Sequence, residues 1–103
     1  MTNTIPTTIV AICTAFCPCK ICCGPLAKGI TASGKFPAQG RTIAVPRNIP
    51  LGTKIEIAGK LYIAEDRTAR KYDGRFDIYF DSHEMARKFG IRTNQVTIWA
   101  TNK

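Results

Sequence analysis

Residues 74–83 read Gly-Arg-Phe-Asp-Ile-Tyr-Phe-Asp-Ser-His and carry the clearest structural signal in the chain. Apolar side chains at positions 76, 78 and 80 alternate with Asp77, Tyr79 and Asp81. A period of two predicts a β-strand with one apolar face. Aspartate is rare inside strands because its short side chain competes for backbone hydrogen bonds. Asp77, in the middle of this strand, therefore needs a physical reason.

Five other segments also predict β-strands, from their Thr, Ile and Val content and their alternation. They cover residues 7–16, 41–45, 54–57, 61–65 and 95–100. Ala58-Gly59-Lys60 predicts a tight hairpin, and residues 29–40 predict a long surface loop. Six strands in about 100 residues favour a small barrel, because closure removes exposed strand edges. We therefore expect one mainly β barrel domain over residues 1–103.

One short helix is expected, at about residues 82–89. Apolar residues at positions 85, 86 and 89 recur at helical spacing and predict a face that packs on the core. Asp81 is expected to cap the first turn, with Glu84 as the reciprocal partner. Gly90 is well suited to end the helix.

The composition is that of a globular domain with an anionic partner. The net charge of +8 predicts an anionic partner, and nucleic acid, anionic lipid and bacterial wall polymer all qualify. The basic residues are spread out, without the aromatic interleaving of nucleic-acid grooves, so we expect no nucleic-acid partner. No apolar run is long enough to span a bilayer. The N-terminus does not resemble a secretory signal, so another factor is expected to bring the chain to any substrate outside the membrane.

Five cysteines lie close together near the N-terminus, namely Cys13, Cys17, Cys19, Cys22 and Cys23. Four cysteines can pair in three ways, and spacing does not choose between them. Cys17-x-Cys19-x-x-Cys22 offers thiolates to zinc, but zinc sites usually have two separated pairs of ligands, and beyond this cluster we find only His83 as a further ligand. We expect a cross-linked or reduced loop, with no metal and no cofactor.

Two interpretations of Asp77 are open from the pattern. It forms a structural salt bridge with one of many basic residues, or it is a general acid whose pKa is raised in a partly apolar cleft. On a straight strand Asp77 and Asp81 would lie about 13 Å apart, at about 3.3 Å per residue. Two-carboxylate glycosidases need roughly 5–9.5 Å, so a mechanism with one acid/base carboxylate fits better.

Several ordered motifs resemble the three-aspartate, or 3D, domain family. The segments that carry the resemblance are 14–17, 22–24, 29–34, 41–45, 49–54, 63–66 and 74–83, which include Thr31-Ala32-Ser33-Gly34, Pro50-Leu51-Gly52-Thr53 and Ile63-Ala64-Glu65-Asp66. The resemblance runs from about residue 14 to residue 99. It implies a six-stranded double-psi β-barrel, related to the catalytic domain of membrane-bound lytic transglycosylase A.

The resemblance also implies an activity on peptidoglycan. In a lytic transglycosylase an acid protonates the oxygen between N-acetylmuramic acid and N-acetylglucosamine. The same group then takes the proton of the sugar's own 6-hydroxyl, which closes a 1,6-anhydro ring without water. Asp77 matches the family's acid and base, Asp66 the supporting aspartate and Asp81 the third aspartate. The residues expected to contact the glycan are Thr31, Ala32, Ser33, Gly34 and Tyr79.

The chain departs from the family pattern between positions 66 and 74. Thr68 and Ala69 replace two glycines, so side chains are expected where backbone would otherwise approach the sugar. Arg67, Arg70 and Lys71 add positive charge, which we expect to lower the pKa of nearby carboxyl groups and to oppose a protonated acid.

Two functions therefore compete. The first is a lytic transglycosylase that acts at the cell wall, in a phage lysin or a virion. The second is a non-catalytic barrel that binds peptidoglycan or builds part of a virion, and the altered segment after Asp66 favours it.

Overall fold

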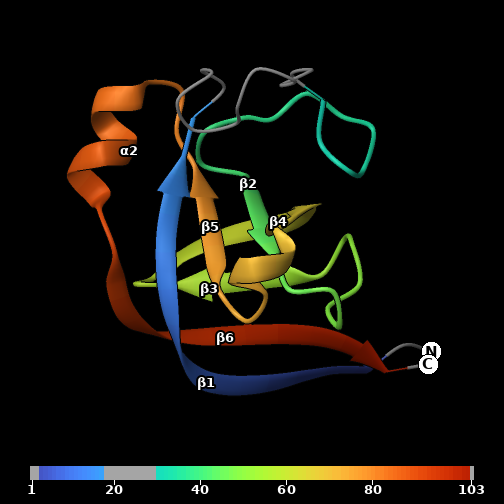
Figure 1. Cartoon of the computed structure of the whole chain (residues 1–103). Helices are drawn as coiled ribbons and strands as arrows, with labels where there is room; N and C mark the ends of the chain where they lie inside the picture. Colours follow the sequence, from blue (N-terminus) through green and yellow to red (C-terminus); the bar gives the residue numbers. More distant parts are fainter. Residues whose placement is uncertain (1–2, 18–29, 103) are drawn as a thin grey trace.

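Six strands close into a barrel with one short α-helix beside it (Figure 1). The computed structural model describes residues 3–17 and 30–102. The strands lie in the order β1-β5-β2-β4-β3-β6, and β6 pairs with β1 to close the barrel. The elements are β1 (Asn3–Phe16), β2 (Thr42–Val45), β3 (Lys54–Ile57), β4 (Lys60–Arg67), the 3-10 helix η1 (Arg70–Tyr72), β5 (Phe76–Tyr79), α2 (His83–Phe89) and β6 (Arg92–Asn102). The predicted barrel with one short helix is confirmed, and its double-psi arrangement stays a prediction.

The apolar face of each strand points into the barrel. The buried core includes Cys13, Ile43, Val45, Ile55, Ile57, Tyr62, Ala64, Phe76, Ile78 and Val96. Successive side chains of a strand point to opposite faces. The residues between these core positions, such as Ala44 in β2 and Asp77 in β5, therefore belong to the outer face.

The strands β1 and β6 are longer than the sequence predicts, because they stabilise each other. They pair antiparallel from Asn3 opposite Asn102 to Cys13 opposite Arg92. This pairing satisfies the backbone groups of polar residues that have little strand propensity of their own. Both strands extend to one side of the barrel, where the two chain ends lie together (Figure 1).

The hairpin predicted between β3 and β4 is confirmed. Ile57 pairs with Lys60, and only Ala58 and Gly59 connect them. Both connecting residues have positive φ, 52° and 77°. Two successive positive φ values are typical of the turn whose twist matches that of the paired strands.

The helix α2 begins one residue later than predicted, and Asp81 does not cap it. The Ser82 hydroxyl accepts a hydrogen bond from the Met85 backbone N–H at 3.1 Å. The Asp81 backbone N–H donates to Oε1 of Gln39 at 2.8 Å. Ser82 is the cap because it directly precedes the first helical residue, so its side chain reaches the free N–H groups of the first turn.

Two other helix expectations have different outcomes. Glu84 forms an exposed ion pair with Lys88 at 3.5 Å instead of a capping box. Gly90 ends the helix as predicted, and its N–H donates to the Ala86 carbonyl oxygen at 3.2 Å.

The predicted core face of α2 is only partly correct. Ala86 is buried, and the ring of Phe89 packs against that of Phe80 with 5.7 Å between centroids. Met85, which we expected in the core, is 47% exposed. Ala86 is the buried residue of this seven-residue helix, so only a narrow stripe of the helix contacts the barrel.

Two of the five cysteines lie in the described part of the chain, and both are buried. Burial raises the pKa of the Cys13 thiol above its ordinary value, while a hydrogen bond with Asn94 opposes the shift. The Cys17 sulfur lies 3.6 Å from Nδ1 of His83. Cys19, Cys22 and Cys23 fall outside the described residues, so the state of the cysteine cluster stays a prediction.

Residues 3–17 and 30–102 contain no group of three or more histidine, cysteine or acidic side chains that could hold a metal ion. In the same part of the chain, no helix is long and apolar enough to cross a membrane.

The observed cap predicts how two neighbouring substitutions differ. Ser82→Ala removes the hydroxyl that accepts from the first turn and is expected to lower the free energy of unfolding by about 1 kcal/mol. Asp81→Ala leaves the backbone contact with Gln39 intact and is expected to change the free energy of unfolding by less than about 0.5 kcal/mol. Urea denaturation measures both. A larger loss in Asp81→Ala than in Ser82→Ala would contradict the assignment of the cap.

Candidate active site

Four side chains from four neighbouring strands form one row on the outer face of the barrel. Thr14 of β1 pairs with Asp77 of β5, and Asp77 pairs in turn with Ala44 of β2. Ala44 then pairs with Asp66 of β4. Paired residues of adjacent strands point to the same face, and the strands lie about 4.8 Å apart. The two aspartates thus flank Ala44, with their Cα atoms about 10 Å apart.

A β-bulge brings Asp66 into this row. Ile43 pairs with Ala64, but the next residue of β2, Ala44, pairs with Asp66, so Glu65 has no partner in β2. Ala64 belongs to the barrel core. Strict alternation would therefore turn Asp66 inward as well. The extra residue reverses the alternation and turns Asp66 outward, beside Ala44.

The bulged residue is held by a buried hydrogen-bond network. The Glu65 side chain is 3% exposed. Its Oε1 accepts from the Thr42 hydroxyl at 2.7 Å and from Nε of Arg41 at 3.1 Å. The Glu65 carbonyl oxygen accepts from the Ser33 backbone N–H at 2.9 Å. The bond from Ser33 satisfies a backbone group of the bulged residue, and the other two satisfy its buried carboxylate.

The row of four side chains lies in an open cleft of about 420 Å³. The residues that line it are Thr14, Ala15, Phe16, Ala44, Asp66, Arg67, Thr68, Ala69, Tyr72, Arg75, Asp77 and Ile91. Ala44 has a small side chain, which leaves room over the strand between the two carboxyl groups. The structure therefore brings Asp66 and Asp77 into one accessible cleft.

Asp77 is electrostatically unusual. Its pKa is raised from 3.8 to about 6, chiefly by burial and to a lesser extent by the nearby negative charge of Asp66. The Thr14 hydroxyl donates a hydrogen bond to Oδ1 of Asp77 at 3.0 Å, which lowers the pKa in part. At mildly acidic pH this carboxyl group exists in both protonation states, so it can donate a proton and take one back.

The salt-bridge interpretation of Asp77 finds no support. Among residues 3–17 and 30–102, none of the ion pairs includes this carboxyl group. The expectation that Arg67, Arg70 and Lys71 lower its pKa was wrong, because the cost of burial outweighs any favourable charge. Arg67 in particular is engaged elsewhere, since its Nη1 donates to the carbonyl oxygens of Pro46 and Ile49.

Asp66 lies at the junction of the cleft and the loop predicted to contact glycan. Its Oδ1 accepts from the backbone N–H groups of Ala32 at 3.1 Å and of Arg67 at 2.9 Å. Thr31 is buried, and its hydroxyl donates to the Lys35 carbonyl oxygen at 2.9 Å. Ala32, Ser33 and Gly34 are exposed beside Asp66. The loop is thus placed next to Asp66, although its residues do not line the cleft itself.

Two other predicted site residues lie away from the cleft. Tyr79 is 5% exposed and packs edge-to-face on Phe16, with 5.4 Å between ring centroids. Asp81 is exposed, just before α2, and does not line the cleft. A direct contact of Tyr79 with sugar and a catalytic role for Asp81 therefore stay predictions from the resemblance.

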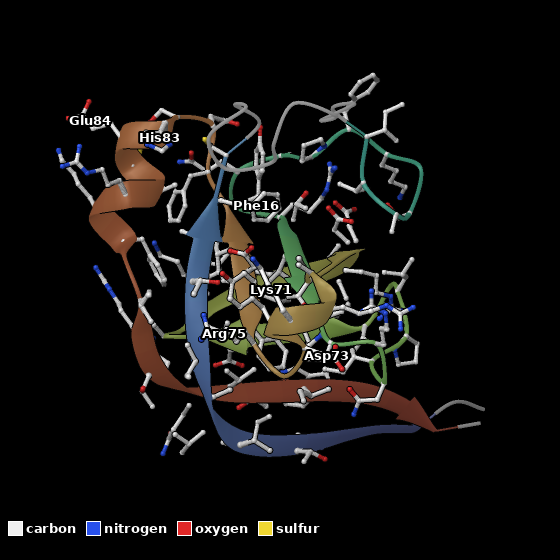
Figure 2. All side chains as sticks on the ribbon, in the orientation of Figure 1. Phe16, Lys71, Asp73, Arg75, His83 and Glu84 are labelled. Carbon is white, nitrogen blue, oxygen red and sulfur yellow. The ribbon has the colours of Figure 1, made fainter. Side chains whose placement is uncertain are left out.

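The segment that departs from the family pattern forms one wall of the cleft. Thr68 and Ala69 both line it, as expected for side chains that replace glycine. Thr68 is buried, and its hydroxyl has no hydrogen-bond partner in the described part of the chain. After Ala69 the chain turns through η1 and returns to β5 at Arg75 (Figure 2).

Four residues that line the cleft were not predicted as site residues, namely Thr14, Ala44, Tyr72 and Arg75. Thr14 and Ala44 enter it only through pairing across strands, which local patterns do not reveal. Tyr72 and Arg75 could have been suspected, because an aromatic and several cations lie between the two aspartates in the sequence.

These features define a small β-barrel domain with two aspartates in one open cleft. The family model of the 3D domain matches residues 41–102, more than half of the chain, and the chain belongs to this family. It is the family of the catalytic domain of membrane-bound lytic transglycosylase A, and it is associated with lytic transglycosylase-like enzymes. The match includes β2 to β6 and lacks β1, which supplies Thr14. Curated proteins gave no match to the chain.

The raised pKa of Asp77 predicts a pH-dependent effect of Asp77→Asn on stability. Between pH 3.8 and about pH 6, Asp77 keeps its proton in the folded protein but loses it in the unfolded chain. The stability of the wild type therefore falls as pH rises through this window. Asparagine cannot ionise, and the variant is expected to be more stable than wild type at neutral pH by on the order of 2–3 kcal/mol. Below the unfolded-state pKa of 3.8 the advantage should vanish.

Urea denaturation of both proteins across this pH range checks the prediction. Glu84→Gln on the surface of α2 is the matched control, because it makes the same carboxyl-to-amide change outside the cleft. A stability difference between wild type and Asp77→Asn that does not grow with pH would contradict the raised pKa.

Proposed function

We propose that this protein is a lytic transglycosylase that cleaves the bond between N-acetylmuramic acid and N-acetylglucosamine in peptidoglycan. One observation carries the proposal: a carboxyl group with a pKa of about 6 lies in an open cleft, without an ion-pair partner among the described residues. Such a group is protonated often enough to act as an acid and is basic enough afterwards to act as a base.

In the proposed reaction Asp77 transfers its proton to the glycosidic oxygen, and the bond between this oxygen and C1 of the muramic acid breaks. The 6-hydroxyl oxygen of the same sugar attacks C1, and its proton returns to Asp77. The 1,6-anhydro ring closes, and the enzyme ends in its starting protonation state. The Thr14 hydroxyl stabilises the Asp77 carboxylate between the two transfers. The negative charge of Asp66 stabilises positive charge that develops at C1.

The proposed reaction places no fixed requirement on the spacing of two carboxyl groups. Retaining glycosidases hold theirs roughly 5–5.5 Å apart for direct attack, and inverting ones roughly 6.5–9.5 Å apart to admit a water. An intramolecular attack by the 6-hydroxyl needs neither arrangement. Asp66, whose Cα atom lies about 10 Å from that of Asp77, is therefore needed only as a supporting charge.

We also propose where the protein acts. Its substrate would place it at the cell wall, and a phage lysin or virion component is one such setting. The net charge of +8 suits an anionic wall polymer.

A second candidate is a non-catalytic module that binds glycan or builds part of a virion. The side chains of Thr68 and Ala69 line the cleft and favour this candidate, because they take up space in the cleft that glycine would leave free. Product analysis separates the two candidates.

Asp77→Asn is expected to lower the release of 1,6-anhydromuropeptides from purified sacculi by about 10²–10⁴-fold, the usual contribution of a general acid or base. Asp66→Asn should cause a smaller loss. Glu84→Gln, on the surface of α2, should behave as wild type. Mass spectrometry of the soluble products measures all four proteins. Undiminished product from Asp77→Asn, or reducing muramic ends in place of anhydro ends, would refute the mechanism.

The pH dependence of cleavage should follow the protonation of Asp77. The rate is expected to fall as pH rises above about 6, because the acid form disappears. Thr14→Val removes the hydrogen bond that lowers this pKa and should move the falling limb to higher pH. Thr14→Ser keeps the hydroxyl and should leave the limb in place. Profiles of kcat/KM against pH measure the shift, and an unmoved limb in Thr14→Val would argue against Asp77 as the acid.

A further inference from the structure

A group of cations lies at the edge of the cleft, in and just after the segment that departs from the family pattern. Arg70, Lys71 and Arg75 lie on η1 and in the turn that follows it. We call residues 70–75 the cationic turn. Its only acidic residue, Asp73, accepts from the Arg47 backbone N–H at 3.1 Å and lies 3.8 Å from the Arg47 guanidinium. Asp73 and Arg75 lie on opposite sides of the turn (Figure 2). Asp73 therefore fixes the turn without neutralising Arg75.

Arg75 is held in the cleft by an aromatic ring. Its guanidinium carbon lies 4.7 Å from the centroid of the Tyr72 ring, and Nζ of Lys71 lies 5.0 Å from the same centroid. Both Tyr72 and Arg75 line the cleft. Stacking on an aromatic ring occupies the face of a guanidinium group and leaves its N–H donors, which lie in the plane, able to bind a ligand.

Arg75 has no acidic partner in residues 3–17 and 30–102, although two carboxyl groups share its cleft. The hydrogen bonds of those aspartates come from Thr14, from Ala32 and from the backbone of Arg67. A positive group that is oriented, half-buried and not neutralised by the protein is suited to an anionic part of a ligand.

The position of Arg75 relative to Asp77 indicates which part of the ligand this is. Both residues line the cleft and are separated by one position, so their Cα atoms are no more than roughly 7 Å apart. In a sugar whose C1 lies at Asp77, the substituents on the ring carbons close to C1 would therefore lie within reach of Arg75. In N-acetylmuramic acid the oxygen at C3, two ring carbons from C1, carries the lactyl group and the peptide stem, with its free carboxylates.

We propose that Arg75, stacked on Tyr72, binds a carboxylate of the peptide stem, so that the protein prefers peptide-bearing glycan strands to bare ones. The inference rests on the proposed function, because it assumes peptidoglycan in the cleft. It adds a specificity determinant, Arg75, at the end of the cationic turn.

Equilibrium binding tests the inference independently of cleavage. The ligands are soluble glycan strands with their peptides, and the same strands stripped of peptides by an N-acetylmuramoyl-L-alanine amidase. Binding is measured in the full chain with Asp77→Asn, so that strands are not consumed. A charge-assisted contact predicts about tenfold or greater preference for the peptide-bearing strands at low salt. Adding Arg75→Gln should abolish the preference and leave the affinity for stripped strands unchanged.

Two further variants complete the design. Arg87→Gln, on the outer surface of α2, removes the same charge away from the cleft and should keep the full preference. Tyr72→Leu keeps every charge but removes the ring that orients Arg75, and should reduce the preference several-fold.

Equal affinity of the parent protein for the two kinds of strand would overturn the inference. So would an Arg75→Gln variant that keeps the preference or that loses affinity for both strands equally. These outcomes are distinct from failure of the proposed function. If wild type releases no anhydro product but Arg75→Gln abolishes the preference, the stem-binding site stands and the catalytic proposal fails.

Discussion

The β-bulge at Glu65 is the constraint on which the cleft depends. One extra residue between Ala64 and Asp66 reverses the inward and outward alternation of β4, so that Asp66 points to the same face as Asp77. The buried Glu65 carboxylate accepts hydrogen bonds from Thr42 and Arg41, and the Glu65 carbonyl oxygen accepts from the backbone N–H of Ser33. The same residue thus fixes the strand register, the loop at residues 31–34 and the position of Asp66. Without it the barrel could still close, but the two carboxyl groups would not share a cleft.

Burial, rather than nearby charge, controls the chemistry of this site. Three cations follow Asp66 closely in the sequence, yet the pKa of Asp77 rises to about 6, because desolvation acts directly on this carboxyl group. Arg67 donates to backbone carbonyls, and Arg75 stacks on Tyr72. The protein therefore keeps a basic surface, which suits an anionic polymer, without converting its acid into a permanent carboxylate. Burial of Asp77 lowers the stability of the fold at neutral pH, a cost that the proposed function would explain.

Local patterns predicted the elements of the fold well. The strand at Phe76, the hairpin at Ala58-Gly59 and the end of the helix at Gly90 all follow from alternation and turn chemistry within a few residues. Errors arose where a contact distant in sequence changed the outcome. The strands β1 and β6 extend further than propensity predicts because they pair with each other. Ser82 rather than Asp81 caps α2, since a difference of one residue in the start of the helix moves the cap. Met85 is exposed because the barrel contacts only a narrow stripe of the helix.

The sequence by itself established a small mainly β barrel, its family, and Asp66 and Asp77 as the residues to consider. The barrel follows from the number and alternation of the strand segments, whereas the family and the choice of Asp66 and Asp77 follow from the resemblance of several ordered motifs. The shared cleft, the hydrogen bond from Thr14 and the stacking of Arg75 on Tyr72 arise from the folded arrangement. Thr14 and Asp77 are 63 positions apart and meet only because β1 and β5 pair in parallel. The pKa of a carboxyl group depends on the water it loses and the charges it meets, and both are set by neighbours in space.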